Sequence, residues 1–211
     1  MKTVGTLLFP GFELLDVFGP LEMFGALDDE YRLESMAESA GEIESRQGMK
    51  AIADIALADA KRYDILLIPG GRGTRHEVGN DALIEWLRGH AEASSVVATV
   101  CTGAALLART GLLDRRNATT NKASFRWVAE QGPNVRWQPR ARWVVDGKYF
   151  TSSGVSAGMD MALALISHLS GAEKAQQVAT YAEYRWNSDP NDDPFCDASG
   201  LGDTMEPSQP A

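Results

Sequence analysis

Three strand-length runs of apolar residues limit most strongly what this chain can fold into. They occupy residues 3–9, 63–69 and 95–100. Consecutive apolar positions require both faces of a strand to be buried, which is typical of a parallel sheet covered by helices on each side. We therefore expect these runs to form the centre of such a sheet.

Helical patterns lie between and after these runs. They cover residues 16–27, 80–93, 102–113, 121–130, 156–169 and 172–184, with Asn80 or Asp81 as the cap of the second. Strands that alternate with helices predict right-handed crossovers. The expected fold class is therefore α/β, a doubly wound sandwich with a mostly parallel central sheet.

Two segments interrupt this alternation. Residues 42–57 contain shorter extended stretches, and residues 141–152 predict a peripheral β-hairpin about an Asp146-Gly147 turn. Since no repeat or linker divides the chain, we expect one domain over residues 1–187.

The last part of the chain has a different composition. Residues 188–211 form a polar, acidic C-terminal tail that includes two prolines within residues 189–194. We expect Trp186 and Phe195 to pack this tail partly on the domain, and the chain to fray from Gly200 onward.

The charge balance narrows the classes of function. The chain has 20 Lys and Arg against 29 Asp and Glu, a net charge of −9, which disfavours nucleic acid as a partner. Its first residues do not resemble a signal peptide, and no apolar run is long enough to span a membrane. We expect a cytoplasmic protein that binds neither nucleic acid nor membranes.

Two cysteines are too few for a disulfide scaffold, and they suit a reducing compartment. Cys101 follows the run 95–100 and precedes a helical pattern that opens with small residues. At such a turn the helix N-terminus favours an anion, so we expect a nucleophile with a lowered thiol pKa. The alternative is a buried cysteine that acts only as a small apolar residue.

Two further loops are expected at the same edge of the sheet, because they also follow strands. Residues 70–73 are rich in glycine, which lets backbone N–H groups point into a site. The alternative is a plain turn that binds no ligand. The loop does not match the phosphate-loop motif. Asp16 follows the first run. It is either a helix cap or a carboxyl group whose apolar surroundings raise its pKa and allow it to donate a proton.

The motifs PGG at 69–71, VCTG at 100–103, ATT at 118–120 and GVSAGMD at 154–160 occur in this order along the chain. Their order resembles the DJ-1/PfpI superfamily. The motif LDVFGP at 15–20, together with CTG at 101–103, resembles the isocyanide hydratase branch of that superfamily.

This resemblance implies a flavodoxin-like sandwich, a homodimer and a cysteine nucleophile, with no metal or organic cofactor. Cys101 and Asp16 correspond to the catalytic residues. Gly71 and Thr102 correspond to positions whose backbone N–H groups stabilise developing negative charge. The pocket candidates are Phe18, Val155 and Asn121.

One residue departs from the pattern of the relatives. Asn121 stands where many of them, including hydratases, have histidine. Thr102 follows the cysteine as a threonine does in isocyanide hydratases, whereas PfpI-type proteases have histidine there. Because a cysteine protease needs a base to activate its thiol, peptidase activity is not expected.

The leading hypothesis is a cofactor-independent hydro-lyase that acts on a small molecule. It adds water to an organic isocyanide and gives an N-substituted formamide through a thioimidate on Cys101, with Asp16 moving the proton. One alternative is a glyoxalase-like activity on small reactive carbonyls, which the missing histidine disfavours. The other is a redox sensor without enzymatic activity, in which Cys101 oxidises to a sulfinate.

Overall fold

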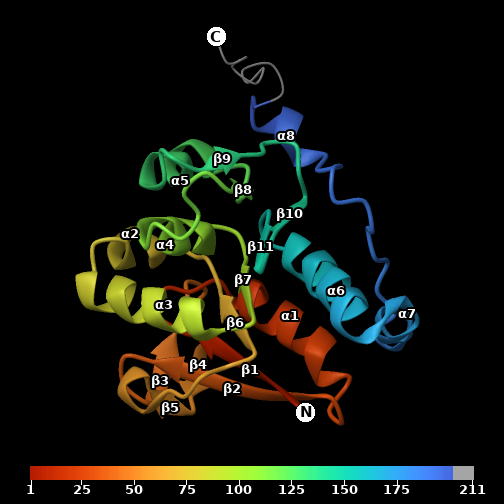
Figure 1. Ribbon diagram of the computed structural model, residues 1–211, viewed down its shortest axis with the longest axis horizontal. Helices are drawn as coiled ribbons and strands as arrows, with labels where there is room; N and C mark the ends of the chain where they lie inside the picture. Colours follow the sequence, from red (N-terminus) through yellow and green to blue (C-terminus); the bar gives the residue numbers. More distant parts are fainter. Residues whose placement is uncertain (202–211) are drawn as a thin grey trace.

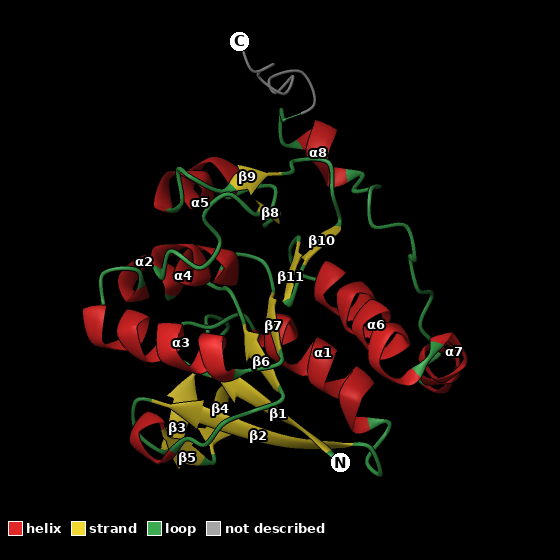
Figure 2. Cartoon of the chain, viewed as in Figure 1, coloured by secondary structure: helices red, strands yellow, loops and turns green. Residues whose placement is uncertain are grey.

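The computed structural model describes residues 1–201, so the fraying predicted from Gly200 falls mostly on residues 202–211, outside the described part. A central sheet lies between two layers of helices (Figure 1, Figure 2). The strands are β1 (Lys2–Leu7), β2 (Tyr31–Ala37), β3 (Gly41–Glu44), β4 (Lys50–Ala53), β5 (Ile55–Ala56), β6 (Ile65–Ile68), β7 (Val96–Thr99), β8 (Asn117–Ala118), β9 (Arg136–Trp137), β10 (Trp143–Asp146) and β11 (Tyr149–Ser152). The helices are α1 (Leu14–Gly25), η1 (Leu57–Asp59), α2 (Thr74–Glu77), α3 (Asp81–Ala93), α4 (Gly103–Arg109), α5 (Phe125–Gln131), α6 (Ala157–Ser170), α7 (Ala172–Tyr181) and α8 (Phe195–Ala198).

The central sheet has seven strands in the order β10-β11-β7-β6-β1-β2-β5. All neighbours in it are parallel except β10 and β11, which form the hairpin predicted about Asp146-Gly147. Strands β3 and β4 form a separate antiparallel hairpin. The prediction of a flavodoxin-like α/β sandwich with a mostly parallel sheet is confirmed.

The apolar runs divide their side chains between two cores. In β6, Ile65 and Leu67 belong to the core beneath α6, whereas Leu66 and Ile68 belong to the core beneath α3 and α4. Successive side chains of a strand point to opposite faces. An uninterrupted apolar strand therefore fills both cores, which is why these runs predicted a sheet covered on both sides.

The direction of winding reverses between β1 and β6. From β1 the chain passes through α1 to β2 on one side, and β6, β7 and β11 extend the sheet on the other. Ligands of open α/β sheets bind outside the carboxyl ends of the strands at such a point. The loops after β1, β6 and β7 meet at this edge, so the fold brings the three predicted loops together.

Several helices begin or end away from their predicted positions. Helix α1 begins at Leu14, so Asp16 lies in its first turn and is not its cap. Helix α4 ends at Arg109, because Gly111 turns the chain with a φ of 79°. The Asn80 side chain does cap α3, since it accepts a hydrogen bond from the N–H of Leu83 at 3.2 Å.

Strand β2 was not predicted. Only three of its residues, Tyr31, Met36 and Ala37, are buried, and the others are partly or fully exposed. It therefore lacks the continuous apolar run that marked β1, β6 and β7. Next to it, only the two-residue β5 closes this side of the sheet.

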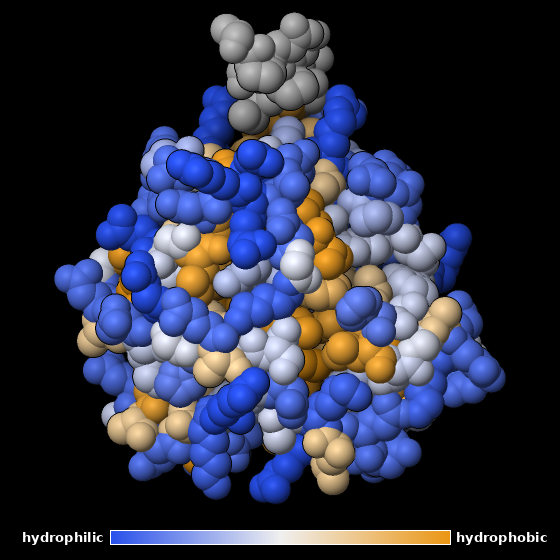
Figure 3. All heavy atoms as spheres, viewed as in Figure 1, coloured by the Kyte–Doolittle hydropathy of each residue, from blue (hydrophilic) through white to orange (hydrophobic). Residues whose placement is uncertain are grey.

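The face of the molecule shown in Figure 3 is mostly hydrophilic. Apolar side chains gather there between α3 and α6, where α1 and the central strands come near the surface. Within residues 1–201 no helix is both long enough and apolar enough to cross a bilayer.

The segment after α7 packs on the domain, but not through both predicted aromatic residues. Trp186 does pack against the α6 core and donates a hydrogen bond to the carbonyl of Asp160 at 3.1 Å. The prediction for Phe195 is wrong, because its side chain is 56% exposed. Helix α8 turns Cys196 inward instead, where it joins Leu201 and Phe125 in a small cluster.

A buried ion pair fixes this segment. Lys122 and Asp193 are both buried, with Nζ and Oδ2 3.6 Å apart. The Lys122 ammonium also donates hydrogen bonds to the hydroxyl of Thr119 at 2.8 Å and the carbonyl of Ala141 at 2.6 Å. Burial lowers the pKa of Lys122 to about 8, so its charge at neutral pH depends on these partners.

We expect Asp193→Asn to destabilise the protein by about 3–5 kcal/mol near pH 7, because it leaves the buried Lys122 ammonium without its counter-charge. Urea unfolding measures this loss. The matched control is Asp197→Asn, which breaks the solvent-exposed pair with Arg140 and should cost at most about 1 kcal/mol. Equal losses in the two variants would contradict a structural role for the buried pair.

Candidate active site

Cys101 occupies the sharp turn between β7 and α4. Its φ is 55°, in the left-handed region that non-glycine residues seldom adopt, at a cost of about 1–3 kcal/mol. The residue is only 6% exposed. A strained turn at the end of a strand is the geometry that presents a nucleophile at the edge of an α/β sheet.

Neighbouring loops hold this turn in place. The N–H of Cys101 donates to the carbonyl of Ser153, after β11, at 3.2 Å. Its carbonyl accepts a hydrogen bond from the hydroxyl of Thr120, after β8, at 2.7 Å. Both backbone groups of Cys101 are therefore satisfied by segments distant in sequence, which offsets the strain of its conformation.

The carboxyl group of Asp16 is fully buried beside this turn. Its Oδ2 accepts a hydrogen bond from the N–H of Gly70 at 2.9 Å. Its Oδ1 has no hydrogen bond of good geometry among the described residues. No cationic side chain pairs with Asp16 within residues 1–201, so the site gives its negative charge little support.

Glycines allow the three loops to approach this closely. A Cβ atom at Gly70 would lie 2.5 Å from the backbone nitrogen of Thr102 and 2.9 Å from Oδ2 of Asp16. A Cβ atom at Gly103 would lie 2.3 Å from the carbonyl oxygen of Ile68. The cysteine turn, the Gly-rich loop and α1 thus pack together only because these positions lack side chains.

Burial raises the pKa of Asp16 to about 8. The hydrogen bond from Gly70 lowers it, the nearby charge of Glu13 raises it, and hydrogen bonding with the Cys101 side chain lowers it. The raised value matches the expectation that Asp16 lies in surroundings that keep it protonated. At neutral pH the carboxyl group is therefore mostly protonated.

The expected lowering of the Cys101 pKa is wrong. Burial raises the pKa of this thiol well above its ordinary value, and the negative charge available to Asp16 raises it further. Hydrogen bonds from Thr102 lower it without reversing the effect. Loss of hydration therefore outweighs the N-terminus of α4, a helix of only seven residues.

The two predicted N–H donors have different surroundings. The N–H of Thr102 lies beside the Cys101 sulfur and lowers its pKa. The N–H of Gly71 instead donates to the hydroxyl oxygen of Thr102 at 3.0 Å, which also accepts a hydrogen bond from Thr74 at 3.1 Å. A role for Gly71 in stabilising charge on a substrate remains a prediction, and it requires the Thr102 hydroxyl to release this N–H.

The pocket candidates are not all in one place. The Asn121 amide lies against Gly154, where a Cβ atom would be 2.0 Å from its Nδ2, so Asn121 and Val155 border the loop that binds the N–H of Cys101. Phe18 is half exposed and borders a different hollow, which it shares with Leu33 and Ile52.

Sequence reasoning named two residues of the site without their roles. Gly70 lies in the expected Gly-rich loop and Thr120 in the ATT motif, but their hydrogen bonds to Asp16 and to the carbonyl of Cys101 were not predicted. Ser153, whose carbonyl accepts a hydrogen bond from the N–H of Cys101, was missed, because no side-chain motif reveals a backbone contact. Glu13 could have been found, because it stands three residues before Asp16, a spacing at which side chains on a helix lie close together. It raises the pKa of both Asp16 and Cys101.

The three histidines lie elsewhere in the described structure. His76 is exposed on α2, His90 stacks on Trp86, and His168 lies beside Phe150. None of them is among the groups that shift the pKa of Cys101 or Asp16. Within residues 1–201, no three His, Cys, Asp or Glu side chains are grouped so that they could hold a metal ion.

The fold and this edge of the sheet define a flavodoxin-like α/β protein with a cysteine at a strained strand-to-helix turn and a buried acid beside it. Residues 2–168 match the model of the DJ-1/PfpI family. The chain belongs to that family, and the sequence resemblance is confirmed.

Known proteins similar to this chain have different functions. It is 31% identical over 182 residues to an isonitrile hydratase of Pseudomonas putida, covering 86% of this chain and 78% of that one. It is 29% identical to the transcriptional regulator CdhR of Pseudomonas aeruginosa, covering 82% of this chain and 52% of the regulator.

Solved structures agree with the fold. A ThiJ/PfpI family protein from Pseudomonas syringae superimposes with a TM-score of 0.81 at 25% identity, over 92% of this chain and 77% of that one. DJ-1beta of Drosophila melanogaster superimposes with a TM-score of 0.77 at 20% identity, over 88% of this chain and 99% of that one.

The Asp16 carboxyl makes a pH-dependent contribution to stability. Its pKa is about 8 in the folded protein against an ordinary 3.8, so the folded state holds the proton more tightly. The contribution is complete below about pH 4 and is lost as the pH rises to about 8.

From pH 5 to pH 8 the free energy of unfolding should therefore fall several kcal/mol further in the wild type than in Asp16→Asn, as measured by urea unfolding. Other titrating groups contribute equally to the pH dependence of both proteins, so the difference between the two curves reports Asp16 alone. Parallel curves for the two proteins would show that Asp16 titrates normally.

Proposed function

We propose that this protein adds water to an organic isocyanide and releases an N-substituted formamide, with Cys101 as the nucleophile and Asp16 as the proton carrier. The observation that carries the proposal is a buried, protonated carboxyl group beside the thiol of a strained turn. The 31% identity to an isonitrile hydratase supports the choice of substrate.

The first step forms a thioimidate. Asp16 gives its proton to the terminal carbon of the isocyanide while the Cys101 sulfur bonds to the same carbon. The thiol proton passes to the carboxylate of Asp16, so the acid ends this step protonated again. Because both groups start neutral, this route never creates an isolated charge in the dry site.

Hydrolysis completes the reaction. Water adds to the thioimidate carbon and loses a proton to the Asp16 carboxylate as Asp16 protonates the imine nitrogen. The tetrahedral carbon then forms its C=O bond as the C–S bond breaks. The hydroxyl proton of the tetrahedral intermediate passes to the sulfur, and the products are a formamide and the free thiol. The N–H of Thr102 stabilises negative charge that develops on the sulfur.

The same observations disfavour the alternatives. Peroxide oxidises accessible thiolates, whereas Cys101 is buried and its pKa is raised, so a redox sensor is disfavoured. A glyoxalase route that relies on histidine is disfavoured because Asn121 holds that position and hydrogen-bonds the N–H of Ser124 at 3.0 Å.

We expect Cys101→Ser to abolish formamide production and Asp16→Asn to reduce kcat/KM about 10²–10⁴-fold, because proton transfer in the transition state is lost. Mass spectrometry of reactions with an alkyl and an aryl isocyanide measures the product. The matched control is Cys196→Ala, which removes the other buried thiol and should leave turnover unchanged.

In the wild type, activity should decline as the pH rises through about 8, because Asp16 then loses the proton that it donates. Normal turnover by Cys101→Ser would remove the thiol from the mechanism. If the wild-type protein is folded but forms no formamide from either isocyanide, the choice of substrate is overturned.

We further propose that the protein is a homodimer that pairs through the hollow bordered by Phe18, Leu33 and Ile52. These apolar side chains come from α1, β2 and β4, and all three are exposed. A second copy would remove this apolar surface from water, which favours association.

Light scattering after gel filtration should find a dimer for the wild type and a monomer for Phe18→Glu, which places a charge in this apolar contact. The control is Phe195→Glu, which alters an exposed aromatic residue on α8 and should leave the dimer intact. A dimer that persists in Phe18→Glu would place the interface elsewhere.

A further inference from the structure

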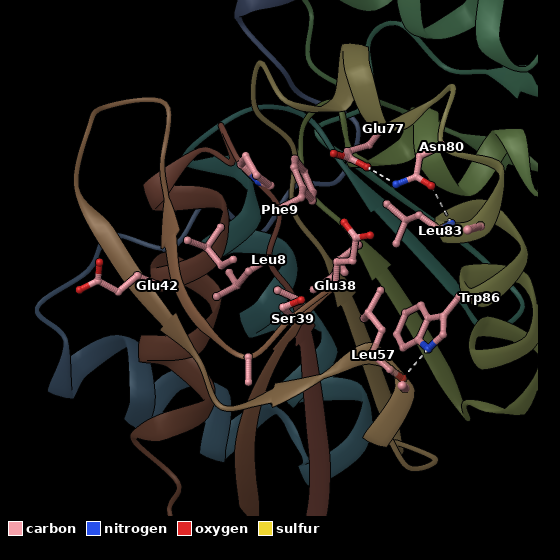
Figure 4. A pocket seen from close by; sticks show the side chains of 17 residues that line it. Leu8, Phe9, Glu38, Ser39, Glu42, Leu57, Glu77, Asn80, Leu83 and Trp86 are labelled. Atoms are coloured by element: carbon pink, nitrogen blue, oxygen red, sulfur yellow. Dashed lines mark hydrogen bonds between the residues drawn. The ribbon is translucent and has the colours of Figure 1, made fainter.

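A second cavity lies away from the cysteine turn. It has a volume of about 510 Å³ and lies between the end of β1, the segment after β2 and the start of α3. Leu8, Phe9, Leu57, Leu83 and Trp86 line most of it with apolar surface (Figure 4). The volume falls in the range of small-molecule sites in proteins, about 300–1,000 Å³.

All of its charged groups have one sign. Glu38, Glu42 and Glu77 line the cavity, and no Lys, Arg or His among the described residues does so. Glu42 forms an ion pair with Lys50, an exposed side chain. Glu38 and Glu77 have no ion pair within residues 1–201, although Glu77 is only 7% exposed.

The carboxyl group of Glu77 is held in place before any ligand arrives. Its Oε2 accepts a hydrogen bond from Nδ2 of Asn80 at 2.9 Å, and Oδ1 of Asn80 accepts from the N–H of Leu83 (Figure 4). Asn80 is therefore fixed as the cap of α3, and it presents Glu77 to the cavity without a loss of side-chain freedom on binding.

Trp86, on the same side of the cavity as Asn80, is also held in place. The indole N–H of Trp86 donates to the carbonyl of Leu57 at 3.0 Å, and its ring stacks on His90 with centroids 3.9 Å apart. Asn80, Leu83 and Trp86 follow one another at intervals of three residues, so they share one face of α3. The cavity is thus a preformed apolar space with one fixed carboxylate, that of Glu77, at its border.

We propose that this cavity binds a small organic cation, an amine or quaternary ammonium compound with an apolar substituent. The apolar lining takes up the substituent, and Glu77 with Glu38 neutralises the cationic group. An anion of the same shape would meet only negative charge, so the site discriminates by charge as well as by shape. Nothing in this proposal depends on the isocyanide reaction.

Its position also links the cavity to the candidate active site. Phe9 and Pro10 line it and lead directly to Glu13 and Asp16. They pack on the Gly-rich loop so closely that a Cβ atom at Gly73 would lie 2.0 Å from the carbonyl oxygen of Pro10. A bound cation would therefore contact a segment that positions the acid.

The test is isothermal titration calorimetry with hexylammonium, hexanol and hexanoate, which share one apolar chain and differ in the charge of the head. Hexylammonium should bind saturably, hexanol about tenfold more weakly, and hexanoate not measurably. Cys101→Ser should bind hexylammonium as the wild type does, because its sulfur does not line the cavity.

Two variants locate the site. Glu77→Gln should weaken hexylammonium about tenfold and leave hexanol unchanged, whereas Glu85→Gln, on the exposed face of α3, should change neither. Ala82→Trp, at an exposed position that borders the cavity, should abolish both by filling it. Circular dichroism confirms that each variant is folded.

Three results would overturn the proposal. The first is no saturable binding of hexylammonium to the wild type, and the second is equal binding of all three probes. The third is binding that survives in folded Ala82→Trp, which would place the probe elsewhere. If the wild type does not bind hexylammonium and Ala82→Trp changes the oligomeric state, the cavity is instead a contact between copies of this chain.

Discussion

The burial of the Asp16 carboxyl group beside the Cys101 thiol is the constraint on which the site depends. Burial raises the pKa of both groups, and the charge of Asp16 raises the pKa of Cys101 further, so little in the site supports a charge on either. The pair therefore remains neutral at pH 7. In the proposed reaction, its reactivity would come from moving protons between neutral groups, and not from a preformed thiolate.

This neutral pair exists only because the backbone approaches it closely. Gly70 brings an N–H to the carboxyl group where any side chain would collide with Thr102. Pro20 in α1 cannot donate a hydrogen bond to the carbonyl of Asp16 four residues earlier, which leaves this turn of the helix less constrained. Packing thus sets the electrostatics of the site.

The strain of the cysteine turn extends the site far along the chain. Thr120 holds the carbonyl of Cys101, and the neighbouring Thr119 accepts a hydrogen bond from Lys122. Lys122 in turn pairs with Asp193 in the C-terminal segment. A segment that composition alone describes as a polar tail is therefore connected by contacts to the turn that carries Cys101.

The sequence predicted the elements that bury continuous apolar surface, and it missed those that do not. The runs 3–9, 63–69 and 95–100 became β1, β6 and β7 because both of their faces fill a core. Strand β2 buries only three residues, at its two ends, so its apolar pattern is weak. The meeting of Cys101 with Asp16 was also predictable, since the carboxyl ends of the parallel strands β1, β6 and β7 share one edge of the sheet.

The protonation of the site was only half predictable. Apolar neighbours in the sequence indicated a raised pKa for Asp16, but the helix N-terminus suggested the opposite shift for Cys101. The balance depends on how completely the sulfur is removed from water. That follows from the packing of loops distant in sequence, two of which anchor the cysteine turn through Ser153 and Thr120. No local motif carries this information.

The neutral state of the pair also bears on which substrates suit the edge of the sheet. A charged substrate would lose its hydration without gaining a counter-charge, because Asp16 is protonated and no cationic side chain pairs with it within residues 1–201. A neutral molecule with one small reactive carbon has a much smaller desolvation cost. An isocyanide has this character, and the formamide that forms is neutral as well. The cavity near α3 has the opposite property, since all of its charged side chains are acidic and would favour a cation. The fold thus separates two environments, and the Phe9-Pro10 segment is the part of the chain that borders one and leads into the other.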